Sequence, residues 1–122
     1  MNGIHQNGKA TFTAGGPVAK GEFVKLADGK AVKCTDAGDR AVGVALDGAE
    51  MGAYVPVQLL VSGDTVPVKA GGAVAQGGSL TCLGATDVSP GTLQYGIALE
   101  AASDAGDIIE AMVGLPAIHT IA

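Results

Sequence analysis

The sequence has 122 residues, of which 48% are hydrophobic and 20 are glycine, and it carries a net charge of −5 at pH 7. A chain of this length can bury roughly two-thirds of its unfolded surface in one domain, so it needs no disulfide or metal to hold a core. These figures exclude a disordered chain, a nucleic-acid-binding protein, which needs clustered cations, and a membrane-spanning helix, which needs about 20 consecutive apolar residues.

From residue 10 onward, short apolar runs are separated by turn residues about every 6 to 12 positions, the pattern of an all-β sandwich or small barrel. The polar residues 1–9 should form a flexible N-terminal arm, and residues 115–122 a C-terminal tail. No stretch has the apolar i, i+3, i+4, i+7 spacing of a helix, so we expect little helix. The expected strands cover residues 10–13, 23–26, 31–34, 41–46, 53–61, 65–69, 80–83, 93–98 and 107–113.

Two kinds of residue refine this arrangement. Asp28-Gly29 stands between two strand-like runs and predicts a tight hairpin. Pro56 and Pro67 lie inside expected strands and have no backbone N–H to donate. Their strands should therefore lie at a sheet edge or contain a bulge.

The chain contains two similar segments, about residues 15–59 and 71–113. The matching stretches are GGPVAKG (15–21) with GGAVAQG (71–77), and GVALD (43–47) with GIALE (96–100). Each segment is too short to bury its apolar face comfortably by itself, so the two should cover each other. We therefore expect a single domain over residues 10–114, an internally duplicated barrel or sandwich with pseudo-twofold symmetry.

No residue set has the spacing of a catalytic, cofactor-binding or metal site, so we expect no enzyme, no cofactor and no metal. His5 and His119 are the only histidines and lie near the two ends of the sequence. Asp47 and Glu100 occupy equivalent places in the two segments. We expect these two carboxylates to cap turns rather than to share a proton.

Cys34 and Cys82 are the only cysteines, and they show neither a CxxC motif nor the spacing of zinc ligands. The first residues lack the basic start and apolar run of a signal peptide. We therefore expect synthesis in a cytoplasm, with two buried or half-buried thiols.

The charges are unevenly distributed, because every Lys and Arg lies before residue 70 and the remaining residues carry only acidic groups. The acidic half could be merely a solvated surface, or the neutral half could face a partner. The mean hydropathy of +0.37 is high for a small monomer. It favours a homo-oligomer with an apolar interface, unless Ala and Gly alone raise the value.

The order and spacing of these motifs resemble a family of small capsid decoration (cement) proteins of tailed bacteriophages, over roughly residues 10–114. The resemblance rests on GPVAKG (16–21), GVA (43–45), AGGAVAQG (70–77) and GIALEAA (96–102). It implies a virion protein, made in the host cytoplasm, that binds the major capsid protein on the outside of the head and stabilises it. Such proteins often form trimers. The first segment departs from the pattern by its longer, more basic hairpin over residues 28–40.

The candidate capsid contacts fall in two groups. The arm would become ordered on the capsid, and the first segment would lie nearer the shell than the acidic second one. The residues concerned are Asn2, Gly3, Ile4, His5 and Gln6 of the arm, and Lys20, Lys25 and Lys30 of the first segment.

Two other functions remain open at this point. One is a self-assembling structural or fibre-base protein. The other is a small β binding module displayed on a virion. Such a module would need an exposed aromatic platform, whereas Tyr54 and Tyr95 both fall within expected strands. Neither nucleic acid nor membrane is an expected partner.

Overall fold

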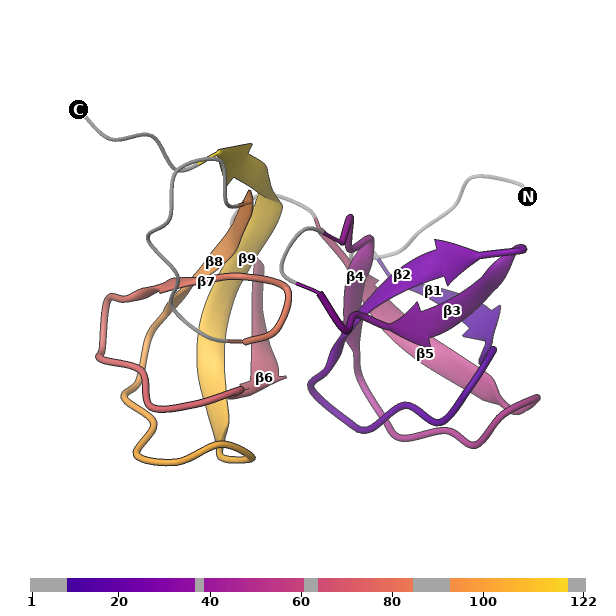
Figure 1. The fold of residues 1–122 in the computed structure, drawn as a ribbon, viewed down its shortest axis with the longest axis horizontal. Coiled ribbons are helices and arrows are strands. Elements are labelled where there is room, and N and C mark those ends of the chain that lie inside the picture. The colour runs from indigo at the N-terminus through magenta and orange to yellow at the C-terminus, as the bar shows by residue number, and fades with distance from the viewer. Residues whose placement is uncertain (1–8, 37–38, 61–63, 85–92, 119–122) are drawn as a thin grey trace.

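The computed structural model describes residues 9–36, 39–60, 64–84 and 93–118, and within these ranges the chain forms nine strands and no helix (Figure 1). Each expected strand has a counterpart, so the all-β class is confirmed. The strands are β1 (Lys9–Thr13), β2 (Phe23–Ala27), β3 (Lys30–Lys33), β4 (Gly43–Ala45), β5 (Tyr54–Leu59), β6 (Asp64–Lys69), β7 (Ser79–Leu80), β8 (Leu93–Ala98) and β9 (Ile108–Ile118). No helix in this part of the chain is long and apolar enough to cross a membrane.

The strands form two antiparallel sheets that lie side by side in Figure 1. The first sheet has the order β1-β5-β4-β2-β3, and the second has the order β6-β9-β8-β7. A parallel bridge between Ala14 and Ala31 joins the end of β1 to β3, so the first sheet curls back on itself. The first sheet therefore encloses an interior of its own.

The two sheets repeat one hydrogen-bonding scheme. The order β1-β5-β4-β2 corresponds to β6-β9-β8-β7, and only β3 has no counterpart among the described residues. Val18 and Ala49 exchange two backbone hydrogen bonds of 2.9 Å, as do Val74 and Ala102. Val18 and Val74 therefore occupy equivalent positions in the two halves, as the sequence comparison predicts. An origin of the two halves by duplication stays a prediction.

The buried side chains form two clusters. The cluster inside the first sheet consists of Ala14, Val18, Val24, Ala31, Ala45, Val55 and Val57. The shared cluster between the sheets combines Phe23, Cys34, Ala41 and Val44 of the first half with residues of the second that include Val66, Val68, Leu80, Cys82, Tyr95, Ile109 and Val113. The expected covering of one half by the other is thus present, but the first half also has a core of its own.

Strands β2 and β4 are buried on both faces, because successive side chains of a strand point to opposite sides. Phe23 packs in the shared cluster, whereas its neighbour Val24 packs inside the first sheet. Val44 and Ala45 divide in the same way. This double burial explains the consecutive apolar residues Phe23-Val24 and Val44-Ala45, where a strand buried on one face would alternate apolar and polar residues.

The two prolines differ in position. Pro67 lies on β6, an edge strand, as expected. β5, which contains Pro56, lies inside the first sheet between β1 and β4, so the edge prediction for Pro56 is wrong. The Pro56 carbonyl accepts a hydrogen bond of 2.8 Å from the Leu46 N–H, just after β4 ends. The N–H that Pro56 lacks would lie just beyond the end of β4. Its absence therefore does not interrupt the pairing of the two strands, and β5 continues past Pro56.

The β2–β3 hairpin has the expected turn, whereas the last strand extends beyond its expected end. Asp28 and Gly29 have φ values of 52° and 77°, the positive angles that a tight two-residue hairpin requires. β1 begins at Lys9 and residues 1–8 lie outside the described residues, so the expected arm is not described. β9 continues to Ile118, which pairs with Leu93, so the sheet extends beyond the expected domain end at residue 114.

Candidate functional site

The predicted capsid contacts lie partly outside the described residues. Asn2, Gly3, Ile4, His5 and Gln6 all belong to residues 1–8, of which nothing structural is described. The three predicted lysines all lie in the first half of the chain and belong to two neighbouring features, the turn before β2 and the β2–β3 hairpin.

Lys20 lies in the turn before β2 and is exposed. Lys25 pairs across the hairpin with Val32, and Lys30 pairs with Ala27, so Lys25 and Lys30 share one face of β2 and β3. Neither Lys20 nor Lys30 forms an ion pair with a described carboxylate. These two lysines are therefore available to an external partner.

Lys25 has a structural role instead. Its Nζ lies 3.0 Å from Oδ1 of Asp39. The Asp39 Oδ2 accepts hydrogen bonds from the backbone N–H groups of Thr35 (2.9 Å) and Asp36 (3.1 Å). The Thr35 N–H and the Lys25 ammonium lower the pKa of Asp39, and the hydrogen bond to Asp39 raises the pKa of Lys25. Lys25 thus holds the chain that follows β3, and its side chain is only partly exposed to solvent.

A second charged cluster lies where the two sheets meet. The Glu22 Oε2 lies 3.5 Å from the Lys69 Nζ and 3.8 Å from the Lys33 Nζ, while the Glu22 Oε1 accepts a hydrogen bond of 2.9 Å from the Ala19 N–H. Sequence reasoning missed this cluster, because Glu22 and Lys69 are 47 residues apart and no local motif connects them. Glu22 links a strand of each sheet through one carboxylate.

These residues border a cavity of about 190 Å³ at the junction. Its lining includes the charged side chains of Glu22, Lys33 and Lys69 and the two cysteines, Cys34 and Cys82. The cavity is small compared with the roughly 300–1,000 Å³ of a typical ligand pocket. Its size fits a few water molecules or a very small solute better than an organic cofactor.

Cys34 follows β3 and Cys82 follows β7, and both are free and buried, which confirms the expectation of buried thiols. The two thiols lie close together at the junction cavity and influence each other's pKa. The Cys82 Sγ also donates to the Asp36 carbonyl at 3.1 Å. The neighbouring Cys82, together with burial, raises the pKa of Cys34, and the neighbouring Cys34 lowers the pKa of Cys82.

Of the two equivalent acidic residues, Asp47 caps a turn, as expected, whereas Glu100 accepts a hydrogen bond from the backbone of β9. The Asp47 Oδ1 accepts a hydrogen bond of 2.9 Å from the Gly48 N–H, and the Glu100 Oε1 accepts one of 2.7 Å from the Glu110 N–H. In the described ranges no three His, Cys, Asp or Glu side chains are grouped as a metal site.

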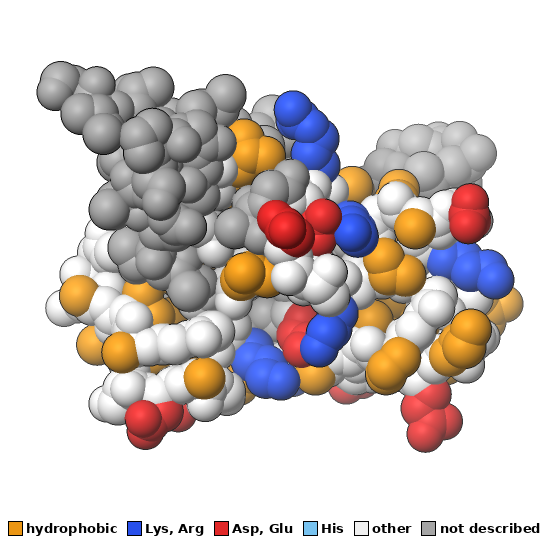
Figure 2. Space-filling view, in the orientation of Figure 1, with side chains coloured by type: hydrophobic (Ala, Val, Ile, Leu, Met, Phe, Trp, Pro, Cys, Tyr) orange, Lys and Arg blue, Asp and Glu red, His pale blue; other side chains and the backbone are white. Residues whose placement is uncertain are grey.

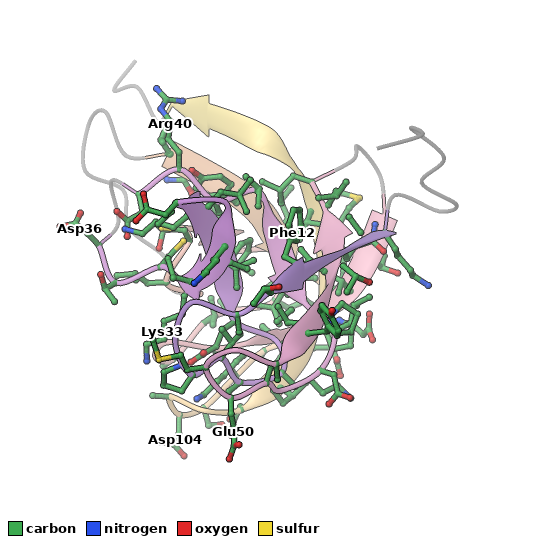
Figure 3. All side chains as sticks on the ribbon, turned by 90° about the vertical axis from the view of Figure 1, so that its right-hand side faces the viewer. Phe12, Lys33, Asp36, Arg40, Glu50 and Asp104 are labelled. Atoms are coloured by element: carbon green, nitrogen blue, oxygen red, sulfur yellow. The ribbon has the colours of Figure 1, made fainter. Side chains whose placement is uncertain are left out.

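The basic side chains gather over the first sheet and the junction, whereas acidic side chains occur over both sheets. In Figure 2, Lys and Arg side chains lie over the first sheet and the junction, and none lies over the part of the second sheet farthest from the first. The described acidic residues of the second half are all exposed: Glu100, Asp104, Asp107 and Glu110. Figure 3 shows Glu50 and Asp104 at the same end of the molecule and Arg40 at the opposite end.

Exposed apolar side chains accompany these charges. Ile97 of β8 pairs with Met112 of β9 on the outer face of the second sheet, and both are exposed. Tyr54 is 77% exposed although it lies in β5, whereas Tyr95 is buried. One exposed ring does not form the stacked aromatic platform of a sugar-binding module.

A family model described as phage cement protein matches residues 4–115, and the chain therefore belongs to the phage cement protein family. This confirms the resemblance seen in the sequence. It makes the protein a structural component associated with the phage capsid, and thus with the virion.

One solved structure supports the fold. The N base of the head fiber gp8.5 of bacteriophage phi29 is similar to this chain, with a TM-score of 0.66 and 18% sequence identity. The similarity covers 87% of this chain and 92% of that chain. No curated protein matches the sequence.

Proposed function

We propose that this protein is a cement protein that binds the outer surface of a phage head and stabilises the head by bridging subunits of the major capsid protein. Its role is non-enzymatic. The observation that carries the proposal, beyond family membership, is the division of charge, with every Lys and Arg before residue 70. The first sheet and the junction would face the shell, and the acidic second sheet would face solvent.

The strand that follows residues 1–8 lies in the same sheet as β2 and β3, in or next to which the available lysines lie, which supports this orientation. β1 is the first strand in the sheet order, and residues 1–8 precede it directly. A segment that leaves a sheet in this way can add to a strand or a groove of a partner. Lys20 and Lys30, both exposed, would supply charge contacts with an acidic region of the shell.

Binding to expanded heads that lack the protein tests this proposal. The full-length protein should co-sediment with such heads and raise the temperature at which they release DNA. Removing residues 2–6, which contain no Lys, Arg, Asp or Glu, should weaken binding several-fold at low and at high salt. Replacing Lys20 and Lys30 with Ala should weaken binding several-fold at low salt and less at high salt, because salt screens exposed charges. The matched control is D104N/E110Q, which changes two exposed charges on the second half and should bind like the unmodified protein.

The proposed oligomer on the head is a homotrimer. The exposed pair Ile97 and Met112 supports an apolar contact between copies. Native mass spectrometry of the protein released from heads should show complexes of three chains. A single chain would contradict the trimer without contradicting capsid binding.

A second candidate is a base on which a fibre assembles, favoured by the fold similarity to the N base of a head fiber. A fibre base would associate with itself or with a fibre partner in the absence of heads. Size-exclusion chromatography with and without heads distinguishes the two functions. A cement protein should form its stable assembly on the head, whereas a fibre base should already be assembled in free solution.

A further inference from the structure

The two cysteines meet at the junction although they come from different sheets. Cys34 ends the β2–β3 hairpin of the first sheet, and Cys82 follows the short strand β7 of the second. Both belong to the shared cluster and both line the junction cavity. The Cys82 Sγ also donates a hydrogen bond of 3.1 Å to the carbonyl of Asp36, two residues after Cys34, so the two cysteines lie close together.

We propose that Cys34 and Cys82 form an oxidation site, at which a hydroperoxide converts the two thiols into an intramolecular disulfide that joins the two sheets. The proposal is independent of capsid attachment. The chain around the pair is already restrained, because the Cys82 Sγ donates to the Asp36 carbonyl and Asp39 binds Lys25. Closing the disulfide requires the two sulfur atoms to approach each other to a bond length of about 2.05 Å.

Cys82 is the residue that reacts first. The neighbouring Cys34 lowers the pKa of Cys82, whereas the pKa of Cys34 is raised, and thiolates rather than thiols are the nucleophiles. The cavity beside it is large enough for hydrogen peroxide, and Leu83, which also lines the cavity, is exposed. A small oxidant can therefore reach Cys82 without separation of the sheets.

The reaction has two steps. The Cys82 thiolate attacks one oxygen of hydrogen peroxide, the O–O bond breaks, and the departing hydroxide takes up a proton to become water, which leaves a sulfenic acid on Cys82. The Cys34 sulfur then attacks the Cys82 Sγ, and the displaced hydroxide takes the Cys34 proton to form a second water molecule. Two thiols and one peroxide thus give one disulfide and two waters.

The expected consequence is a covalent connection between the sheets. The bond would close a long loop of chain that contains β4, β5, β6 and β7. Cross-links that close long loops restrict the unfolded chain most, so the oxidised protein should unfold at a higher temperature than the reduced protein. The reducing interior of a cell would keep the thiols free, and oxidation would follow exposure to an oxidising medium.

Mass spectrometry of the full-length protein tests this proposal. After treatment with one equivalent of hydrogen peroxide, the intact mass should fall by about 2 Da, and the unfolded protein should take up no iodoacetamide. Thermal unfolding should shift upward by several degrees, whereas C34S/C82S should show no shift with peroxide. In the presence of dimedone, C34S should be labelled at Cys82, and C82S should remain unlabelled.

Three results would overturn the proposal. The first is two iodoacetamide additions to the peroxide-treated protein, which would mean that no disulfide had formed. The second is a disulfide between two chains on a non-reducing gel. The third is an intramolecular disulfide with no rise in unfolding temperature, which would contradict the joining of the sheets. The measurements on the unmodified protein decide the outcome even if a variant fails to fold.

Discussion

The Tyr95 hydroxyl donates a hydrogen bond of 2.8 Å to the backbone carbonyl of Asp39. The same oxygen accepts a hydrogen bond of 3.1 Å from the Ala41 N–H. Tyr95 belongs to β8 of the second sheet, whereas Asp39 and Ala41 lie between β3 and β4 of the first. Its ring also packs against Phe23, with the ring centroids 5.8 Å apart. One side chain therefore holds the two sheets together through both polar and apolar contacts.

Replacing Tyr95 with Phe should destabilise the protein by about 1–3 kcal/mol, because the buried Ala41 N–H would lose its partner while the ring packing would remain. Urea unfolding followed by circular dichroism measures the change. The matched control is Y54F, which removes a hydroxyl from an exposed ring and should cost less than about 0.5 kcal/mol. Equal effects of the two variants would contradict the role of Tyr95.

The ion pair between Lys25 and Asp39 predicts a pH-dependent stability. The pKa of Asp39 is lowered in the folded protein by the Thr35 N–H and by Lys25, so the charged carboxylate favours folding. This stabilisation is present above the ordinary aspartate pKa of about 3.9 and is lost as the pH falls through the lower folded value.

The substitution D39N should therefore lower the urea midpoint at pH 7 and have much less effect at pH 2.5. D104N, which changes an exposed carboxylate without a described ion pair, serves as the control and should have little effect at either pH. A D39N effect that is equally large at both pH values would contradict this assignment.

Gly21 and Gly77 occupy equivalent turns and have nearly equal φ values of 87° and 85°. A Cβ atom on Gly21 would lie 2.6 Å from the Lys69 backbone nitrogen, whereas a Cβ on Gly77 would have no atom within 4 Å. Both alanine variants should suffer the strain of a positive φ, roughly 1–2 kcal/mol. G21A should lose a further 1–3 kcal/mol, roughly, from the clash at the junction.

Thermal unfolding of G21A and G77A side by side measures this difference. Because the backbone strain is common to both, the excess in G21A reports the close packing of the first half on β6. A loss in G77A as large as that in G21A would show that backbone strain, and not the junction, determines the cost.

The capping role of Glu100 predicts a smaller loss of stability than the substitutions above. The Glu110 N–H donates to the Glu100 Oε1, and Pro56, which aligns with Glu110, has no N–H at all. E100A should therefore destabilise the second sheet by about 0.5–1 kcal/mol, and D47A should not disturb β5. Hydrogen exchange at the Glu110 amide checks this directly. Unchanged protection of that amide in E100A would contradict the capping role.

The strands could be predicted from the sequence because their signals are local. Asp28-Gly29 specifies a hairpin turn by its allowed backbone angles, and the runs around it have the apolar composition of strands. The place of Pro56 could not be predicted, because whether a missing N–H matters depends on where the neighbouring strand ends. β4 is only three residues long, and it stops before it reaches Pro56.

The junction was also beyond prediction from the sequence. Cys82 and Asp36 are 46 residues apart, and Tyr95 and Asp39 are 56 apart. No spacing rule connects residues so distant, because their contact depends on how one sheet packs on the other. The exposure of Tyr54 could not be predicted for a related reason, since a strand pattern alone does not show which end of a strand projects from the core.

Electron microscopy of expanded heads decorated with the full-length protein tests the proposed function most directly. We expect density on the outer surface of the head, with the first sheet and residues 1–8 against the major capsid protein and the acidic second sheet toward solvent. Heads that carry this density should withstand higher temperature than bare heads. Bare shells at saturating protein concentration, or density with the second sheet against the shell, would contradict the proposal.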